Sequence, residues 1–316
     1  MTLFSLRRAM LVAACASATL LAACGSGSTE NALTPSRFIV FGDAFSDVGQ
    51  SGATYSVNDA TVNNWVQRVA SRFSLSITAS GSGGFGYARV NARVVNKPDA
   101  GGSSSTLTIK EQIDTFLASN SIGSSDVLVV SAGVADVVTE MNTVTAGTET
   151  EATMISNLQQ AGRDLGTQVR RLVTAGAKQV VVVGPYYVGR TPWATSLGKA
   201  DLLSNGSSKF NDALLVSIVD LGSNVLYVDA AYYLNLVTGT PSSYSLIDST
   251  TVVCTATDSG VGIGIGTGQV NSSLCTSSNV STTAYNSYTF ADQLFFTPVV
   301  NRLFGDYAYT KIRDRF

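Results

Sequence analysis

The chain has 316 residues, of which 45% are hydrophobic and only 13% are charged, and its net charge is -2. This length is enough for one large α/β domain or two small ones. The charge is too low and too acidic for a nucleic-acid-binding surface, so no nucleic-acid partner is expected. The sequence contains no histidine. A metal site would therefore depend on carboxylates and thiolates alone, and we expect neither a metal nor a cofactor.

Residues 1–23 have the pattern of a secretory signal peptide. Two arginines precede an apolar stretch at 10–21 that is too short to span a bilayer. The sequence Leu-Ala-Ala-Cys at 21–24 resembles the lipobox of bacterial lipoproteins, in which the cysteine is lipidated and becomes the new N-terminus. The alternative is an ordinary cleaved signal with an incidental cysteine. We favour lipidation of Cys24, which would anchor the protein to the bacterial envelope membrane. Gly25 after the cysteine suggests the outer membrane, by resemblance to bacterial sorting rules.

The rest of the chain is predicted to be a flexible tether, 24–36, followed by a single domain, 37–316, because no composition shift or repeat divides it. Strands are predicted at 38–41, 126–131, 179–184 and 225–228, and helices at 63–73, 109–117, 153–175, 209–219 and 298–313. The strands are apolar and rich in β-branched residues, and they alternate with helices. This pattern predicts a parallel sheet covered on both faces, which is a doubly wound α/β/α sandwich.

Two loop regions carry further signals. Residues 238–289 are polar and Gly-rich, and they contain Cys254 and Cys275, which we expect to form a disulfide in an oxidising compartment. The alternating glycines at 260–268 lack the strand–helix context of a dinucleotide fingerprint and belong to this loop. The aromatic loop at 184–193 would either line a ligand groove or pack over the sheet edge.

Four short blocks resemble those of the GDSL/SGNH hydrolase superfamily of esterases and lipases. Gly-Asp-Ala-Phe-Ser-Asp at 42–47 is similar to the family's Gly-Asp-Ser-x-Ser-Asp. The segments at 86–93, 133–136 and 292–295 are similar to Tyr-Ala-x-Gly-Gly-Ala-Arg, Gly-x-Asn-Asp and Asp-x-x-His. The resemblance implies a three-layer α/β/α sandwich with a parallel, flavodoxin-like sheet. It also places the site at the carboxyl ends of the strands.

The blocks depart from the family pattern at the reactive positions. The family's serine attacks an ester carbonyl, a histidine held by an aspartate activates the serine, and Gly and Asn help to bind the oxyanion. By resemblance, these roles fall on positions now occupied by Ala44 (serine), Asn91 (glycine), Ala135 (asparagine) and Phe295 (histidine), and only Asp292 is retained. We therefore predict that ester hydrolysis is lost. The expected function is binding or scaffolding in the envelope, with an acyl or glycan ligand in the family's cleft. An alternative is a purely structural lipoprotein whose cleft is filled.

The competing hypothesis is an active ester hydrolase with a non-standard site. Ser46 would then be the nucleophile, although a serine after a strand is also a common turn or cap residue. Asp43 and Asp136 would act as an acid–base pair or hold a cation, or would instead accept bonds from backbone amides in their turns. Asn91 would supply an amide donor, or would be an ordinary loop residue.

Overall fold

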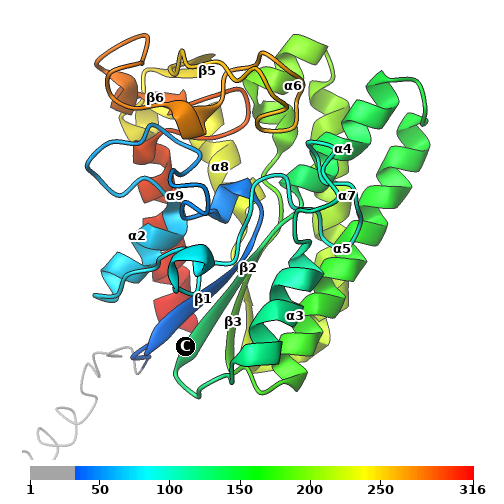
Figure 1. The fold of residues 1–316 in the computed structure, drawn as a ribbon, viewed down its shortest axis with the longest axis vertical. Helices are drawn as coiled ribbons and strands as arrows, with labels where there is room; N and C mark the ends of the chain where they lie inside the picture. Colours follow the sequence, from blue (N-terminus) through cyan, green and yellow to red (C-terminus); the bar gives the residue numbers. More distant parts are fainter. Residues whose placement is uncertain (1–32) are drawn as a thin grey trace, which may run out of the picture. The chain divides into compact units, whose positions relative to one another are not determined.

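A parallel sheet of four strands lies at the centre of residues 33–316, the part of the chain that the computed structural model describes (Figure 1). The strands are β1 (Arg37–Gly42), β2 (Asp126–Ser131), β3 (Gln179–Val183) and β4 (Val225–Tyr227), and they lie in the order β1-β2-β3-β4. The first three are mostly apolar runs that are buried on both faces, as the sequence predicts, whereas β4 at the sheet edge is only partly buried. The Arg37 guanidinium pairs with Asp126 at 2.8 Å and fixes the register where β1 and β2 begin.

A short segment extends the sheet beyond β1. The amide of Val40 donates to the carbonyl of Phe85 at 2.9 Å, and the amide of Tyr87 donates to the carbonyl of Val40 at 2.7 Å. Residues 85–87 thus form a parallel bridge on the free edge of β1. If this segment is counted as a strand, the sheet has the flavodoxin-like order that the resemblance implies.

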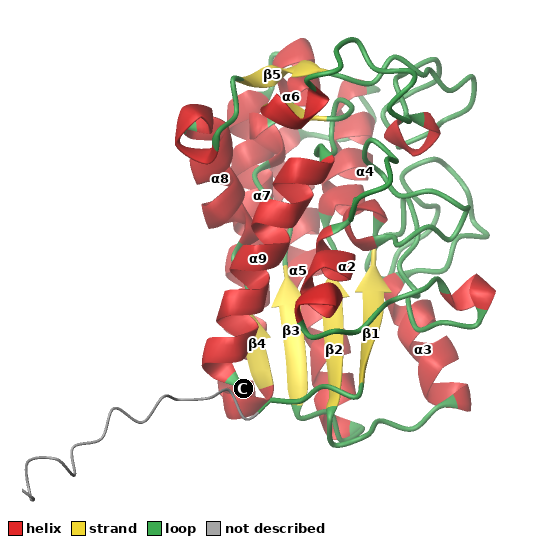
Figure 2. Cartoon of the chain, turned by 90° about the vertical axis from the view of Figure 1, so that its left-hand side faces the viewer, coloured by secondary structure: helices red, strands yellow, loops and turns green. Residues whose placement is uncertain are grey.

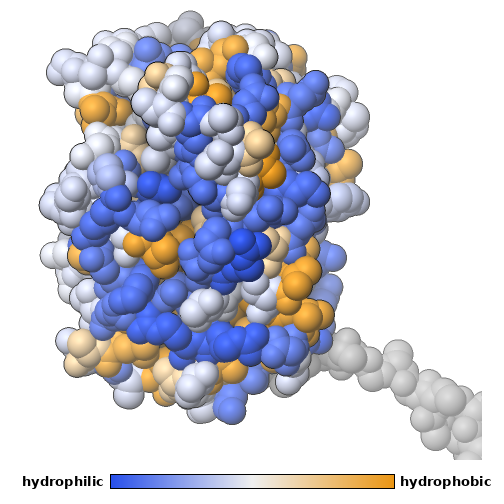
Figure 3. All heavy atoms as spheres, turned by 90° about the vertical axis from the view of Figure 1, so that its right-hand side faces the viewer, coloured by the Kyte–Doolittle hydropathy of each residue, from blue (hydrophilic) through white to orange (hydrophobic). Residues whose placement is uncertain are grey.

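Helices cover both faces of the sheet (Figure 1). One layer contains α2 (Trp65–Arg72), α8 (Ala230–Gly239) and α9 (Pro298–Arg315), and the other contains α3 (Ile109–Ser119), α4 (Val134–Thr145), α5 (Glu151–Thr174) and α7 (Ala200–Ile218). The predicted α/β/α sandwich is therefore confirmed. The outer face of the α5 layer is largely hydrophilic, as expected for the solvent side of amphipathic helices (Figure 3).

The carboxyl ends of the strands point toward a thick layer of loops (Figure 2). This layer contains the short helix α6 (Pro192–Leu197) and a small parallel sheet of β5 (Asp248–Val252) and β6 (Tyr288–Phe290). Cys254 and Cys275 are joined by a disulfide, as their number and setting predict. The aromatic loop at 184–193 packs against the neighbouring loops, since Tyr186 is buried and its hydroxyl donates to the carbonyl of Leu294 at 2.7 Å.

Several elements differ from the predictions. The helices α4, α6 and α8 are not predicted from the sequence, and α7 begins at Ala200 rather than 209. The first half of α7 is rich in Ser, Asn and Gly, which are poor helix formers, but its glycine at 206 lies directly on the side chains of α5. Tertiary packing therefore overrides local propensity there. Among the described residues, no helix is long and apolar enough to cross a membrane.

Candidate functional site

The turn that follows β1 is held by close backbone contacts. A side chain on Gly42 would place its Cβ 2.4 Å from the carbonyl oxygen of Ser131, so only glycine fits. The side-chain amide of Gln112 in α3 donates to the Gly42 carbonyl at 3.0 Å and accepts from its amide at 2.9 Å. Residues Ala44–Ser46 then form one turn of 3-10 helix capped by Asp43. The first block is thus a rigid strand-to-turn unit.

Asp43 is buried and its carboxylate is occupied by backbone amides. It accepts hydrogen bonds from Phe45 at 3.1 Å, from Val134 at 3.0 Å and from Ala135 at 3.4 Å. Two of these donors belong to the first turn of α4, whose dipole favours a negative charge there. Burial raises the pKa of Asp43 to about 6, against the lowering effect of these bonds. Asp43 therefore ties the end of β1 to the start of α4.

The positions that the resemblance assigns to the family's serine, asparagine and histidine converge on one nearly filled cavity. Ala44, Ala135 and Phe295 all line it and are all buried. The space open to the centre of a water molecule is only about 10 Å³, roughly what a single water needs. The Phe295 ring packs against Tyr55 with ring centres 5.6 Å apart. No ester group fits between these side chains.

A residue from the disulfide-bonded loop completes the filling. Ile263 lies between the alternating glycines and is only 2% exposed, and it lines the same cavity. The loop is held by two side-chain amides, because Asn91 donates to the Gly262 carbonyl at 2.9 Å and Asn142 donates to the Gly264 carbonyl at 2.8 Å. The amide group of Asn91 is thus used to position the loop.

Asp292, which the resemblance assigns to the family's triad, is fully buried and bonded to the backbone. Its carboxylate accepts from the amides of Leu294 at 2.8 Å, Phe295 at 2.7 Å and Ser272 at 3.1 Å. Burial raises its pKa, and these bonds oppose the rise. Ser272 lies three residues before Cys275, so Asp292 connects the turn before α9 to the disulfide-bonded loop. This is a structural role that needs no histidine.

Asp136 belongs to a different buried cluster. Its carboxylate accepts from the Val94 amide at 3.1 Å and lies 3.4 Å from the Arg93 guanidinium, which also pairs with Glu140 at 2.6 Å. Burial raises the pKa of Asp136 to about 7, although the charge of Arg93 opposes this. The alternative in which these carboxylates bond backbone amides therefore fits the geometry. Within residues 33–316 no group of three acidic or cysteine side chains is placed to hold a metal ion.

Ser46, the alternative nucleophile, is inaccessible. Its hydroxyl accepts from the indole N–H of Trp65 at 3.2 Å, and the residue has no exposed surface. The side-chain amide of Asn64 donates to the carbonyls of Phe45 and Asp47, each at 3.2 Å, which fixes the turn on the start of α2. No carboxylate is hydrogen-bonded to the Ser46 hydroxyl as a base. The turn and cap interpretation of Ser46 matches these contacts.

Two important residues do not stand out in the sequence. Ile263 fills the cleft, and its signal is the alternation of aliphatic residues with glycines from Gly260 to Gly266, which indicates a loop with one apolar side. Gln112 holds the Gly42 turn, and its signal is a single amide on the otherwise apolar buried face of α3. Neither signal identifies the partner, because both contacts join segments far apart in the chain.

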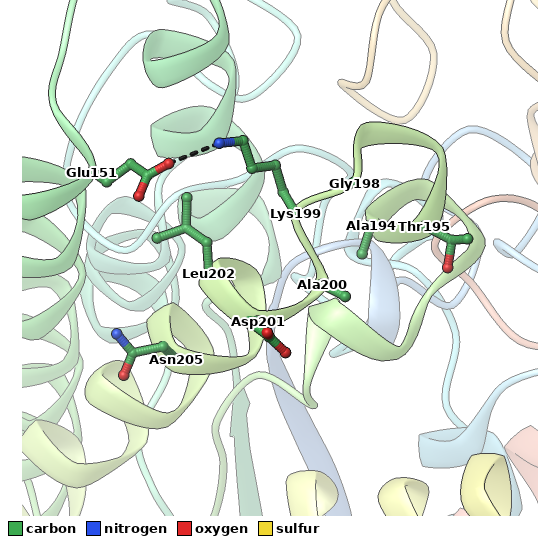
Figure 4. Close-up of a pocket in the computed structure, with 9 residues that line it drawn as sticks. All are labelled: Glu151, Ala194, Thr195, Gly198, Lys199, Ala200, Asp201, Leu202 and Asn205. Carbon is green, nitrogen blue, oxygen red and sulfur yellow. Dashed lines mark hydrogen bonds and ion pairs between the residues drawn. The ribbon is translucent and has the colours of Figure 1, made fainter.

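A larger surface depression lies elsewhere on the described part of the chain. It has a volume of about 730 Å³ and is formed where α6 meets α7, with Glu151 of α5 at its edge (Figure 4). Lys199 pairs with Glu151 across it at 2.8 Å. It shares no residue with the four blocks, so it is not the site that the blocks indicate.

The whole domain was also compared with known proteins. The family model described as GDSL-like Lipase/Acylhydrolase matches residues 38–308. A search of curated proteins finds no match. The matched range includes all four blocks and nearly all of the described elements. The chain therefore belongs to the GDSL-like lipase/acylhydrolase family, as the blocks predict.

Proposed function

We propose that this protein is a catalytically inactive member of its family that acts as a binding or scaffolding protein in the bacterial envelope. One observation carries the proposal. Where the family has a reactive serine and its base, this chain has Ala44 and Phe295 packed around a cavity of about 10 Å³. A methyl group cannot attack a carbonyl, and a phenyl ring cannot accept the proton.

The size of the expected loss is large. In a serine hydrolase, removing the nucleophile or the base alone lowers kcat by roughly a factor of 10⁶. Here both are replaced, and the chain has no histidine that could serve from another position. The remaining polar groups, Asp43 and Asp292, have their oxygens occupied by backbone amides.

The proposed setting is the outer membrane, with lipid on Cys24 as the anchor. Cys24 and the signal pattern at 1–23 lie outside the described residues, so this part of the proposal is supported by the sequence alone. Metabolic labelling with a fatty acid tests it. Label is expected in the wild type and not in a Cys24→Ser variant, and equal labelling of the two would contradict the anchor.

The enzyme proposal is tested by hydrolysis of a short-chain p-nitrophenyl ester, with an active esterase as the positive control. We expect the wild-type protein to turn over no faster than buffer. An Ala44→Ser/Phe295→His variant, which restores the two reactants, serves as the comparison. Turnover by the wild type that disappears in Ser46→Ala, with folding unchanged, would contradict the proposal.

The second candidate function is hydrolysis by a non-standard site. One observation favours it: burial raises the pKa of Asp43 to about 6 and of Asp136 to about 7, values suited to general acid catalysis. The same ester assay tests this second function. If it is correct, the wild type hydrolyses the ester, and Asp43→Asn or Asp136→Asn abolishes that activity. We prefer the inactive assignment because neither carboxylate faces a cavity that admits a substrate.

A further inference from the structure

A second cavity opens beside the filled cleft. Its volume is about 370 Å³, within the usual range of about 300–1,000 Å³ for small-molecule sites. It is formed by the turn after Ser46, the segment after Tyr87 and the loop before α3. The lining residues are predominantly polar and consist of Asp47, Gln50, Ser51, Arg89, Val90, Ser105, Thr106 and Leu107.

Arg89 is the distinctive group of this cavity. Among the arginines of residues 33–316, it is the one whose guanidinium makes no hydrogen bond or ion pair; all the others have partners. Its Nε is shielded from water and has no acceptor. Shielded donors without a partner are exceptions in folded proteins. The two terminal nitrogens of the guanidinium are not shielded in this way, so they are the donors that a ligand in the cavity would meet.

The nearby carboxylate does not satisfy this arginine. Asp47 is the acidic residue that lines the cavity, and it forms no ion pair with Arg89 within 4 Å. Burial raises the pKa of Asp47, and the charge of Arg89 lowers it from a longer distance. Its Oδ1 instead accepts from the amides of Gly49 at 2.9 Å and Gln50 at 2.8 Å. The guanidinium therefore keeps its planar set of donors free, and this geometry matches a carboxylate with two parallel bonds.

We propose that this cavity binds a small sugar acid, with the ligand carboxylate on the Arg89 guanidinium and the ligand hydroxyls facing the polar wall. Ser51, Ser105 and Thr106 line the same space. The Thr106 hydroxyl already donates to Asp99 at 2.5 Å and the Ser105 hydroxyl bonds to that of Ser103 at 2.9 Å, but a hydroxyl oxygen with one bond can still accept from the hydroxyls of a polyhydroxylated ligand. The volume exceeds the need of an inorganic anion, and the scarcity of apolar lining does not suit an acyl chain. The inference rests on the proposed binding function and names its site and ligand class.

Saturation-transfer NMR and titration calorimetry with glucuronate test the inference, using the mature protein. We expect glucuronate to bind, and glucose, its uncharged counterpart, to bind at least about tenfold more weakly, because the charge-assisted bonds are lost. Arg89→Gln should weaken glucuronate binding by a similar factor. Arg163→Gln is the matched control, since Arg163 is exposed and bonds only to Gln160 of its own helix, and it should bind as the wild type does.

Arg89→Lys adds a check on geometry, because it keeps the charge but loses the planar fork. It should bind more weakly than the wild type and more tightly than Arg89→Gln. The inference is overturned if the wild type does not bind glucuronate at millimolar concentrations. It is also overturned if Arg89→Gln binds glucuronate as tightly as the wild type does. The same holds if the wild type binds glucose as tightly as glucuronate, or inorganic phosphate more tightly than glucuronate. Circular dichroism of each variant confirms folding.

The ester assay keeps the two proposals separate. Glucuronate binding that depends on Arg89, together with ester hydrolysis by the wild type, would remove the inactive assignment and leave this site in place. If the wild type neither binds glucuronate nor hydrolyses the ester, the proposed binding site is wrong and the inactive assignment stands.

Discussion

At the residue scale, Asp292 has a structural role that its contacts define. Asp292 has no histidine to orient, and yet its two oxygens accept three backbone hydrogen bonds from two separate segments. The carboxylate is thus needed to satisfy buried amides. Its hydrogen bonds give it a reason to be there that does not depend on catalysis.

Replacing Asp292 by alanine should therefore destabilise the protein. Three buried amides would lose their acceptor, and each unsatisfied group costs about 1–3 kcal/mol, so we expect the free energy of unfolding to fall by at least about 3 kcal/mol. Urea denaturation measures this. Asp212→Ala is the control, because Asp212 is exposed and its loss should change the free energy by less than about 0.5 kcal/mol. Equal stability of Asp292→Ala and the wild type would refute the structural role.

The buried carboxylates also predict how stability depends on pH. Burial raises the folded-state pKa of Asp43 to about 6 and of Asp136 to about 7, both from an ordinary value of 3.8. The folded state then holds protons that the unfolded state has released. The free energy of unfolding should therefore decrease as the pH rises from about 4 to about 7, by up to about 1.4 kcal/mol per pH unit for each group.

Denaturation curves measured across this pH range check the sign. Asp136→Asn removes one titrating group, so its free energy of unfolding should depend less steeply on pH than that of the wild type. Stability that increases between pH 4 and 7 would mean that the hydrogen bonds to these carboxylates outweigh their burial.

At the element scale, the loop between Cys254 and Cys275 forms one wall of the former cleft. The disulfide closes it, and Asn91 and Asn142 bond its glycine carbonyls. Asn91 has a φ of 60°, a conformation that asparagine tolerates better than most residues. These contacts hold Ile263 in place without regular secondary structure.

Ile263→Ala should consequently behave as a core substitution although it lies in a loop. Removing a buried isoleucine side chain costs about 2–5 kcal/mol, and we expect a loss of unfolding free energy in this range. The matched control is Val261→Ala in the same loop, because Val261 is 45% exposed and its truncation should cost less than about 1 kcal/mol. Thermal or urea denaturation of both variants makes the comparison. If Ile263→Ala lowered the free energy of unfolding as little as Val261→Ala does, the loop would not be packed as part of the core.

The sequence predicts those elements whose signal is local. The strand cores at 38–41 and 126–131 are buried apolar runs, and the structure confirms both. The helix α4 is not predicted because the motif at 133–136 has the pattern of a turn, whereas Val134 already begins a helix whose first turn is bonded to Asp43. That contact joins distant parts of the chain, as does the insertion of Ile263, and neither leaves a local pattern.

At the scale of the whole molecule, the sheet and its helices form without the serine and histidine of the family pattern. Ala44 follows β1, Ala135 lies in α4, Phe295 precedes α9, and Ile263 comes from the disulfide-bonded loop. Four separate segments therefore close the same space, while the core strands remain those of the family. The open cavity at Arg89 lies beside this closed region. Binding at a neighbouring site is thus compatible with a cleft that is filled.

This arrangement predicts that restoring two reactants is not enough to restore the reaction. In Ala44→Ser/Phe295→His, Ile263 still occupies the space of a substrate, and Ala135 still lacks the amide that would bind an oxyanion. Adding Ala135→Asn supplies an amide donor for the oxyanion, and adding Ile263→Ala opens space for the substrate. One oxyanion donor contributes about 10²–10³ in kcat, so the four-residue variant should exceed the two-residue variant by about 100-fold or more in kcat/KM for p-nitrophenyl acetate.

The control for this comparison is the same four-residue variant with alanine restored at position 44, which lacks only the nucleophile and should show no turnover above buffer. Circular dichroism and thermal unfolding must show that every variant is folded, because Ile263→Ala alone is expected to be costly. A two-residue variant as active as the four-residue one would mean that Ile263 and Ala135 do not obstruct the cleft. The proposed inactivity would then depend on Ala44 and Phe295 alone, and the loop would be a cover that substrates displace.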